Sequence, residues 1–258
     1  MKNQYFGDIN DYRKYGLLRC IIGASELRLL IAWMLTPDDG SADGKFVSYL
    51  KNPSRWSNHD SILFHKISEL LAHEQKRRVS LIEETDLLLK AEYFSAHVPD
   101  SALARDSWFW SLAEQSQTND LIFLDPDNGL EVKSRPYGRK KSSKFIYWRE
   151  VEALWSSGKS LLVYQHFIRE KRFNFIQRIM EEIKNATPGS SVEAFSTPHV
   201  VFLMALQPEH QRFHKAIVTL VQENWEGQIQ HWELTLAQQG SPVDKKSLLD
   251  FVSAGLSR

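Results

Sequence analysis

Short apolar runs separated by helical segments constrain the fold of this chain more than any other feature. Runs rich in apolar residues occupy positions 29–35, 121–124, 160–165 and 199–206, and a more mixed run lies at 229–236. Strands that are buried on both faces have this composition. Apolar residues recur with helical spacing in the segments around them, at 11–24, 61–78, 102–116, 149–155, 169–183 and 209–223. Because parallel strands need long crossovers, the pattern predicts a Rossmann-like three-layer α/β sandwich with a mostly parallel central sheet.

The size and composition are those of one globular domain. The 258 residues predict a single α/β domain, with a helical segment at 1–25 packing on it. Cys20 is the only cysteine, which excludes an internal disulfide and a cysteine-built metal site. No apolar stretch approaches the ~20 residues that cross a bilayer, and the polar start at 1–4 has no signal-peptide core behind it. We therefore expect a cytoplasmic protein.

An acidic turn follows the apolar run at 121–124. The sequence Asp-Pro-Asp-Asn-Gly at 125–129 places Asp125, Asp127 and Asn128 on a proline and glycine turn. Ligands bind at the carboxyl ends of strands in open α/β sheets, so this turn is a candidate active site. The alternative is an aspartate-rich loop that only caps the next element.

A histidine ends another predicted strand. Tyr-Gln-His-Phe at 164–167 follows the run at 160–165, so Gln165 and His166 would lie near Asp125 if the two strands are neighbours. His166 is the best placed histidine for proton transfer. Its alternative role is to cap a helix or bond to the backbone.

Two more segments add polar groups. The loop at 36–40 carries Asp38 and Asp39 after the first predicted strand, and the aromatic and polar segment at 5–16 can fold over the same groove or cover the sheet edge. No zinc-ligand spacing such as His-Glu-x-x-His occurs, so no dedicated zinc site is expected, although the aspartates at 38, 39, 125 and 127 could hold Mg²⁺.

A basic loop is expected at 133–149, where seven Lys or Arg residues alternate with aromatic residues and no acid is present. Such clusters bind phosphate backbones, and aromatic faces stack on exposed bases. The alternative is a solvated surface loop. A smaller basic patch begins the helix predicted at 169–183. The candidate nucleic-acid-binding residues are Lys133, Arg135, Tyr137, Arg139, Lys140, Lys141, Lys144, Arg169, Lys171 and Arg172.

These motifs resemble those of an uncharacterised bacterial family. The likeness rests on Tyr-Phe-Gly-Asp at 5–8, Trp-Met-Leu-Thr-Pro-Asp-Asp-Gly at 33–40, Leu-Asp-Pro-Asp-Asn-Gly at 124–129 and Tyr-Gln-His-Phe at 164–167. It covers about residues 5–172.

Two characterised groups are similar at a greater distance. Nucleic-acid adenine methyltransferases carry Asp-Pro-Pro-Tyr after a strand, but residues 125–128 lack its second proline and its aromatic residue, and no Gly-x-Gly-x-Gly loop follows the first strand. Uracil-DNA-glycosylase-type enzymes place an Asp-Pro step after a strand and a histidine on a late loop, which Asp125-Pro126 and either His166 or His199 would match. The chain also resembles phage-defence glycosylases that excise glucosylated hydroxymethylcytosine.

The resemblance to glycosylases implies a DNA glycosylase that flips and excises a modified base, in anti-phage defence, without a cofactor or metal. Asp125 or Asp127 would orient water, Asn128 and Gln165 would read the base, and His166 would assist its departure; Tyr12 or Trp33 would stack on it, and Asp38 and Asp39 would bond its substituent. The candidate catalytic residues are Asp39, Asp125, Asp127, Asn128 and His166. The candidate substrate-binding residues are Asp8, Asn10, Tyr12, Trp33, Asp38, Gln165 and His199.

Three alternatives remain at this point. The first is an S-adenosylmethionine-dependent nucleic-acid methyltransferase-like protein. The second is a metal-dependent nuclease that uses Asp127, Glu131 and Lys133. The third is a module that binds nucleic acid, DNA or RNA, without catalysis. The sequence leaves the oligomeric state open.

Overall fold

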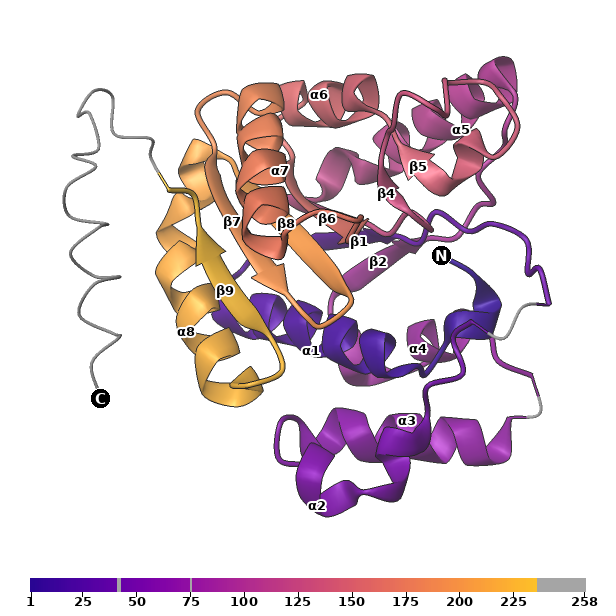
Figure 1. The fold of residues 1–258 in the computed structure, drawn as a ribbon, viewed down its shortest axis with the longest axis vertical. Helices are drawn as coiled ribbons and strands as arrows, with labels where there is room; N and C mark the ends of the chain where they lie inside the picture. The colour runs from indigo at the N-terminus through magenta and orange to yellow at the C-terminus, as the bar shows by residue number, and fades with distance from the viewer. Residues whose placement is uncertain (41–42, 75, 236–258) are drawn as a thin grey trace, which may run out of the picture.

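A seven-stranded mixed sheet forms the centre of the computed structural model, which describes residues 1–40, 43–74 and 76–235 (Figure 1). In spatial order the strands are β2 (Ala91–Phe94), β1 (Leu29–Ala32), β3 (Leu121–Leu124), β6 (Ser160–His166), β8 (Val200–Leu206), β7 (Ser191–Ser196) and β9 (Gln230–Glu233). A separate parallel pair is formed by β4 (Gly129–Leu130) and β5 (Phe145–Ile146).

The first half of the sheet is parallel, as expected. β1 pairs with β2 on one side and β3 on the other, and β3 pairs with β6. In this register Ala32 and Leu124, the last residues of β1 and β3, lie beside Val163, and β6 continues three residues further to His166. The segments that follow β1, β3 and β6 therefore leave the sheet at one edge.

The second half of the sheet is antiparallel, so the prediction of a mostly parallel sheet is wrong. β7, which the sequence analysis did not identify, is joined to β8 by residues 197–199, and Thr197 N donates to Val200 O across this turn. So short a connection can only join antiparallel strands. β8 enters the sheet between β6 and β7 and pairs antiparallel with both, and β9 pairs antiparallel with β7.

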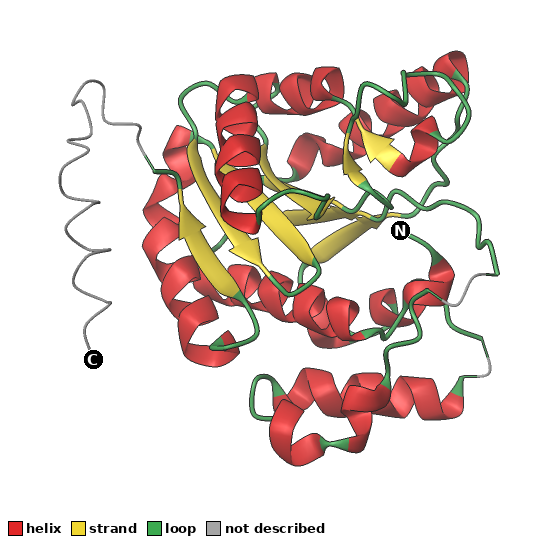
Figure 2. Cartoon of the chain, viewed as in Figure 1, coloured by secondary structure: helices red, strands yellow, loops and turns green. Residues whose placement is uncertain are grey.

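Helices lie on both faces of the sheet (Figure 2). The α-helices are α1 (Ile9–Ala24), α2 (Pro53–Trp56), α3 (Ser61–His73), α4 (Ser80–Glu83), α5 (Ala102–Gln115), α6 (Trp148–Ser156), α7 (Arg172–Ala186) and α8 (His214–Trp225). The 3-10 helices are η1 (Asn3–Tyr5), η2 (Ser48–Lys51), η3 (Asp86–Leu88), η4 (Ser116–Thr118), η5 (Ser142–Lys144) and η6 (Pro208–Phe213).

Alternate strand residues supply two hydrophobic cores. Ile31 and Phe123 pack in the core on the α1 and α8 face, whereas Leu30 and Ile122 pack in the core on the face covered by α5, α6 and α7. This two-residue period explains why the parallel strands are apolar throughout.

Most of the predicted elements are present with shifted ends. The helix expected at 61–78 ends at His73, with residue 75 outside the described residues, and the helix expected at 169–183 is α7. The segment at 209–223 divides into η6 and α8. The strand expected at 229–236 is β9, and its last residue, like the rest of the predicted domain to residue 258, lies outside the described residues.

Helix α1 is a central element of the fold. Its start is capped by Asp8, whose Oδ1 accepts from Asn10 N. It packs against α8 so closely that a Cβ on Gly16 would lie 1.8 Å from Cζ2 of Trp225. Among the described residues, no helix is long and apolar enough to cross a membrane.

Candidate active site

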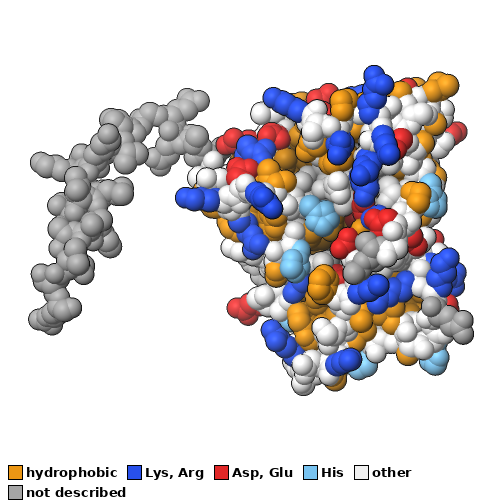
Figure 3. Space-filling model, turned by 45° about the vertical axis from the view of Figure 1, so that its right-hand side comes forward, with side chains coloured by type: hydrophobic (Ala, Val, Ile, Leu, Met, Phe, Trp, Pro, Cys, Tyr) orange, Lys and Arg blue, Asp and Glu red, His pale blue; other side chains and the backbone are white. Residues whose placement is uncertain are grey.

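A cavity of about 560 Å³ opens at the sheet edge where β3 and β6 end. In the space-filling view, acidic side chains gather beside Lys and Arg side chains on this face (Figure 3). The cavity brings together predicted residues from six separate segments of the chain. These are Asp8, Asn10, Asp39, Asp125, Asp127, Asn128, Lys144, His166 and His199.

Asp125 follows β3 directly and is held by a lysine of α1. Its Oδ2 lies 2.8 Å from Nζ of Lys14, and the same Nζ lies 2.7 Å from Oδ1 of Asp11. All three side chains are at most 5 % exposed. Burial opposes the charge on Lys14, but the two carboxylates outweigh it and raise the pKa of Lys14, while burial raises the pKa of Asp11 to about 6. Asp125 is therefore the partner of a buried cation.

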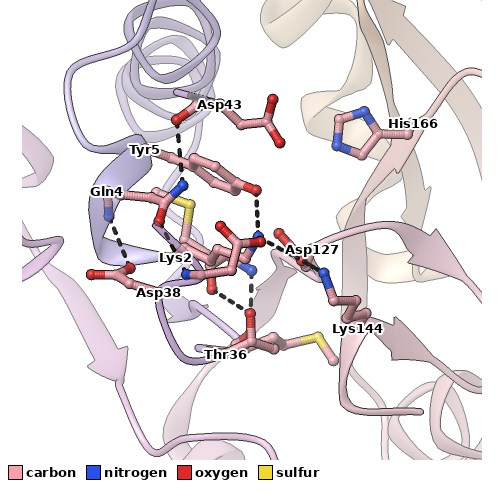
Figure 4. Close-up of polar contacts among 12 residues, drawn as sticks. Lys2, Gln4, Tyr5, Thr36, Asp38, Asp43, Asp127, Lys144 and His166 are labelled. Atoms are coloured by element: carbon pink, nitrogen blue, oxygen red, sulfur yellow. Dashed lines mark hydrogen bonds and ion pairs between the residues drawn. The ribbon is translucent and has the colours of Figure 1, made fainter. Parts of the chain in front are cut away.

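Asp127 has one anchored oxygen and one free oxygen. Its Oδ2 lies 2.7 Å from Nζ of Lys144 and 3.6 Å from Nζ of Lys2 (Figure 4), whereas the buried Oδ1 has no hydrogen-bond partner among the described residues. Burial acts to raise the pKa of Asp127, but the amino groups of Met1, Lys144 and Lys2 outweigh it and lower that pKa. The carboxyl group is therefore an anion at neutral pH.

The N-terminal residues form the wall of the cavity next to β1. Lys2 Nζ lies 2.6 Å from Oδ2 of Asp39 and donates to the hydroxyl of Tyr5 at 2.9 Å. The amino group of Met1 donates to the carbonyl of Asp125 at 3.0 Å, and Thr36 N donates to Met1 O. The chain itself thus fills the space above the carboxyl end of β1.

Two histidines lie on the opposite wall. His166 ends β6 opposite Val200, so His199, in the turn before β8, lies beside it. Nε2 of His166 lies 3.3 Å from the hydroxyl of Tyr164. Burial lowers the pKa of His166, with Asp127 and Asp125 acting in the opposite direction. The imidazole is therefore neutral at pH 7 and can donate or accept one hydrogen bond per nitrogen.

Asp8 and Asn10 line the cavity at the start of α1. Asp8 also accepts from the backbone N of Phe46 through Oδ2, so its carboxylate is occupied by three donors from two segments. Asn10 donates its amide to Asp8 at 2.9 Å, and its buried Oδ1 has no hydrogen-bond partner among the described residues. Asn10 can therefore accept a ligand hydrogen bond.

Several predicted residues lie elsewhere. Gln165 is buried, and its Oε1 accepts from Leu130 N while its Nε2 donates to His166 O, so it fixes β4 against β6 and does not line the cavity. Tyr12 and Trp33 are completely buried in the core and offer no ring face to a ligand. Asp38 is exposed, accepts from Gln4 N, and does not line the cavity.

The basic loop between β4 and β5 joins the cavity through Lys144. Lys133, Arg135, Arg139, Lys140 and Lys141 are exposed, and none of them forms an ion pair within the described part of the chain. These five cations are therefore available to a phosphate backbone.

The aromatic residues of the loop are used for packing instead of being free to stack. Phe145 and Tyr147 are buried, and Tyr137 donates to Asp106 while the guanidinium of Arg149 lies 3.5 Å from its ring centre. The prediction that these rings stack on exposed bases therefore has no support from their placement. At the start of α7, Arg169, Lys171 and Arg172 are exposed, and Arg172 donates to Pro198 O.

Two lysines that pair with the aspartates of the site were not among the predicted residues. Lys2 and Lys14 line the cavity together with Tyr5 and Tyr164. Asp11 and Lys14 are three residues apart on one helix, a spacing that places them on the same face, but this did not indicate that both would be buried.

No known family model and no curated protein matches the chain. Among solved structures, the crystal structure of protein LPL1258 from Legionella pneumophila, described with the family model DUF519, is similar with a TM-score of 0.42. The two chains are 12% identical, and the match covers 88% of this chain and 96% of the other.

Proposed function

We propose that the protein hydrolyses the N-glycosidic bond of a modified base in DNA, with Asp127 as the carboxylate that orients the attacking water. One observation carries this proposal: Asp127 is an ionised carboxylate with Oδ2 fixed by Lys144 and a buried Oδ1 that has no partner among the described residues. A buried acceptor without a partner costs about 1–3 kcal/mol, which a bound water or sugar hydroxyl would recover.

The residues around the cavity supply the other parts of this reaction. Water oxygen bonds to C1′ as the bond from C1′ to the base nitrogen breaks, the negative charge of Asp127 stabilises the positive sugar, and the water proton passes to its carboxylate. The departing base takes up the bonding electrons, and neutral His166 donates a hydrogen bond to it. Asn128 and Asn10 line the same cavity and would contact the base or its substituent.

Entry of a nucleotide requires a local rearrangement. The side chain of Asp127 is 2 % exposed, and Lys2, 3.6 Å from its Oδ2, is tied to Asp39. Lys2 or its neighbours must move before water and a sugar can reach Oδ1. A flipped base, which brings phosphates with it, would supply an alternative partner for the ammonium group.

DNA with glucosylated hydroxymethylcytosine is the substrate that the glycosylase resemblance favours. The protein is incubated with such phage DNA and with unmodified DNA, without added metal or cofactor, and abasic sites and released base are measured. We expect release only from modified DNA. Asp127→Asn should lower the rate by about 100-fold or more, since electrostatic groups of this kind contribute that much.

A matched control is Asp86→Asn, which removes an exposed carboxylate of η3 outside the cavity. It should leave the rate unchanged. Absence of base release from modified DNA, or equal rates for Asp127→Asn and the native protein, would contradict the proposal.

A methyltransferase is the second candidate. It is favoured by the position of Asp125-Pro126 directly after β3 and by the helices on both faces of the sheet, as in a Rossmann-like fold. Two features weaken it: Asp125 is engaged by Lys14, and Met1 and Thr36 fill the space above β1. This candidate predicts S-adenosylmethionine binding by calorimetry, which a glycosylase should not show.

The nuclease alternative has less support. Glu131 and Lys133 do not line the cavity, and a carboxylate oxygen of Glu131 accepts from the backbone N of Trp148. Lysines occupy the positions beside Asp125 and Asp127 that Mg²⁺ would need. Metal-dependent cutting of DNA would nevertheless reveal a nuclease.

A further inference from the structure

Three potential metal ligands meet on the other half of the sheet, far apart in sequence. Glu193 comes from β7, His231 from β9 and His214 from the first residue of α8. Glu193 pairs with Glu233, and Phe195 pairs with His231, so Glu193 and His231 are diagonal neighbours on the same face of the sheet. The ligand atoms of the three side chains all lie within 4.8 Å of one another.

The geometry of His214 points to a shared centre. His231 Nε2 lies 2.7 Å from one carboxylate oxygen of Glu193, and His214 Nε2 lies 3.0 Å from the other. The contact of His214 lacks the alignment of a hydrogen bond, and this buried nitrogen has no hydrogen-bond partner among the described residues. A nitrogen close to a carboxylate oxygen but not aligned with it is expected when both atoms face a common ion.

We propose that Glu193, His214 and His231 bind a divalent transition metal, with Zn²⁺ as the ion that best fits two imidazoles and one carboxylate. Zinc bonds of about 2.0–2.2 Å would separate neighbouring ligand atoms by slightly more than the 2.7 and 3.0 Å observed here, so binding needs only a small opening of the cluster. The side chain of His214 is 32% exposed but its Nε2 is buried, so the small opening of the cluster must also admit a water as the fourth ligand.

The ion would join three elements at the edge of the sheet. β9 has four residues and pairs only with β7 in the described sheet, and α8 precedes it. A metal bound by one residue from each element ties the edge strand and the helix to β7. None of the three ligands lines the cavity that contains Asp127, so the ion has a structural role separate from the proposed hydrolysis.

The environment also distinguishes this cluster from the aspartates of the cavity. Asp125 and Asp127 are neutralised by lysines, whereas the ion pairs of Glu193 in the described residues are with the two histidines alone. Imidazole nitrogens are themselves metal ligands, so within the described residues no lysine or arginine competes with a metal for this carboxylate.

The test uses the full chain with any polyhistidine tag removed. After chelator treatment and dialysis, Zn²⁺ binding is measured by calorimetry and by competition with a chromogenic chelator, and thermal unfolding is followed with and without zinc. We expect one zinc per chain and a higher Tm in its presence. His231→Ala should weaken binding by at least about 100-fold, because even residues that only support a ligand contribute about 10- to 100-fold.

Two further variants keep the result interpretable. Glu193→Gln preserves the size of the side chain and should also lose both binding and the Tm increase, while His73→Ala, at an exposed position of α3, should keep both. Equal zinc affinity in His231→Ala, Glu193→Gln and the native protein, or no zinc bound by the native protein, would overturn the proposal. The hydrogen bond between His231 and Glu193, with His214 packed beside it, would then explain the cluster.

Discussion

Lys144 Nζ lies 2.7 Å from Oδ2 of Asp127, so the basic loop and the candidate catalytic carboxylate share an ion pair. A second link runs through the main chain, because Asn128 N donates to Lys144 O at 2.9 Å. The two contacts couple the position of the loop to that of the acidic turn. A phosphate that attracts Lys144 would therefore act directly on the environment of Asp127.

Two replacements of Lys144 should distinguish the effect of its charge on Asp127 from the effect of its side-chain packing. Lys144→Gln removes the cation that helps to lower the pKa of Asp127, so we expect the carboxyl group to be protonated more easily and the rate of base release to fall about 10-fold or more. Lys144→Arg keeps the charge and should recover most of the rate. The measurement is the pH dependence of base release for the three proteins, and equal profiles for Lys144→Gln and native protein would contradict the coupling.

The five exposed cations of the basic loop should govern the salt dependence of DNA binding. Replacing Arg139, Lys140 and Lys141 with Gln should weaken binding at low salt and reduce the slope of log K against log salt by about 0.7–0.9 for each phosphate that these residues neutralise. Replacing Arg212 and Lys215, exposed residues of η6 and α8, provides a control outside the loop, with the change in slope compared per cation removed. A slope that changes equally in both sets would mean that the loop is only a solvated surface.

The sequence predicted the position of the candidate site at the sheet edge better than it predicted which charged residues surround it. Asp125 follows one apolar run, with Asp127 in the same turn, and His166 ends another. Because helical crossovers imply parallel pairing of β3 with β6, their meeting at one edge could be inferred from local patterns. Lys2 and Lys14 could not be found this way, because their burial depends on how α1 and the N-terminal residues lie against the sheet.

The errors have the same origin. Glu193 interrupts the apolar pattern at 191–196, so this segment was not predicted to be strand β7. Without β7, residues 197–199 could not be recognised as the turn of an antiparallel hairpin, and the sheet was expected to be mostly parallel. Tyr12 and Trp33 illustrate a second limit. Large aromatic residues are compatible with ligand stacking and with core packing, both in a mixed segment (Tyr12) and at the end of an apolar run (Trp33), and here their environment is the core.

Gly129 provides a test of the local structure of the acidic turn. Its φ is +119°, and an added Cβ would lie 2.3 Å from Oε1 of Gln165, which accepts from Leu130 N. Gly129→Ala should therefore lower the free energy of unfolding by about 2 kcal/mol or more through backbone strain and a broken buried hydrogen bond. Gly158→Ala is the control, because Gly158 also has a positive φ of +82° but its Cβ would have no neighbour within 4 Å.

Urea denaturation of both variants distinguishes the backbone strain that both share from the contact with Gln165 that only Gly129→Ala makes. We expect Gly158→Ala to lose only about 1–2 kcal/mol, the cost of the left-handed backbone. If both glycine variants lose the same amount, the contact between Gly129 and Gln165 has no energetic consequence and the turn is less tightly fixed than the structure indicates.

His166 should produce an acid limit to activity. Burial lowers its pKa below the usual 6.5, so the imidazole is neutral at pH 7 and becomes charged only in more acidic solution. If the neutral form donates to the departing base, kcat/KM should be constant from about pH 6.5 to pH 8 and fall below that range. His166→Gln should lower kcat/KM by about 100-fold and remove the acid limb assigned to the imidazole.

The same shift fixes the sign of the effect on stability. Because the pKa of His166 is lower in the folded chain, the unfolded chain binds this proton more readily. His166 therefore does not change the free energy of unfolding above about pH 6.5, and it lowers that free energy as the pH falls from there toward the folded-state pKa. Asp11, with a pKa of about 6, gives the opposite trend, because its ionisation as the pH rises from about 4 to 6 favours the unfolded chain.

The pH profile of His166→Gln decides which group causes the acid limb of kcat/KM. If the limb persists in this variant, it belongs to another group such as Asp11, and His166 does not have its proposed role.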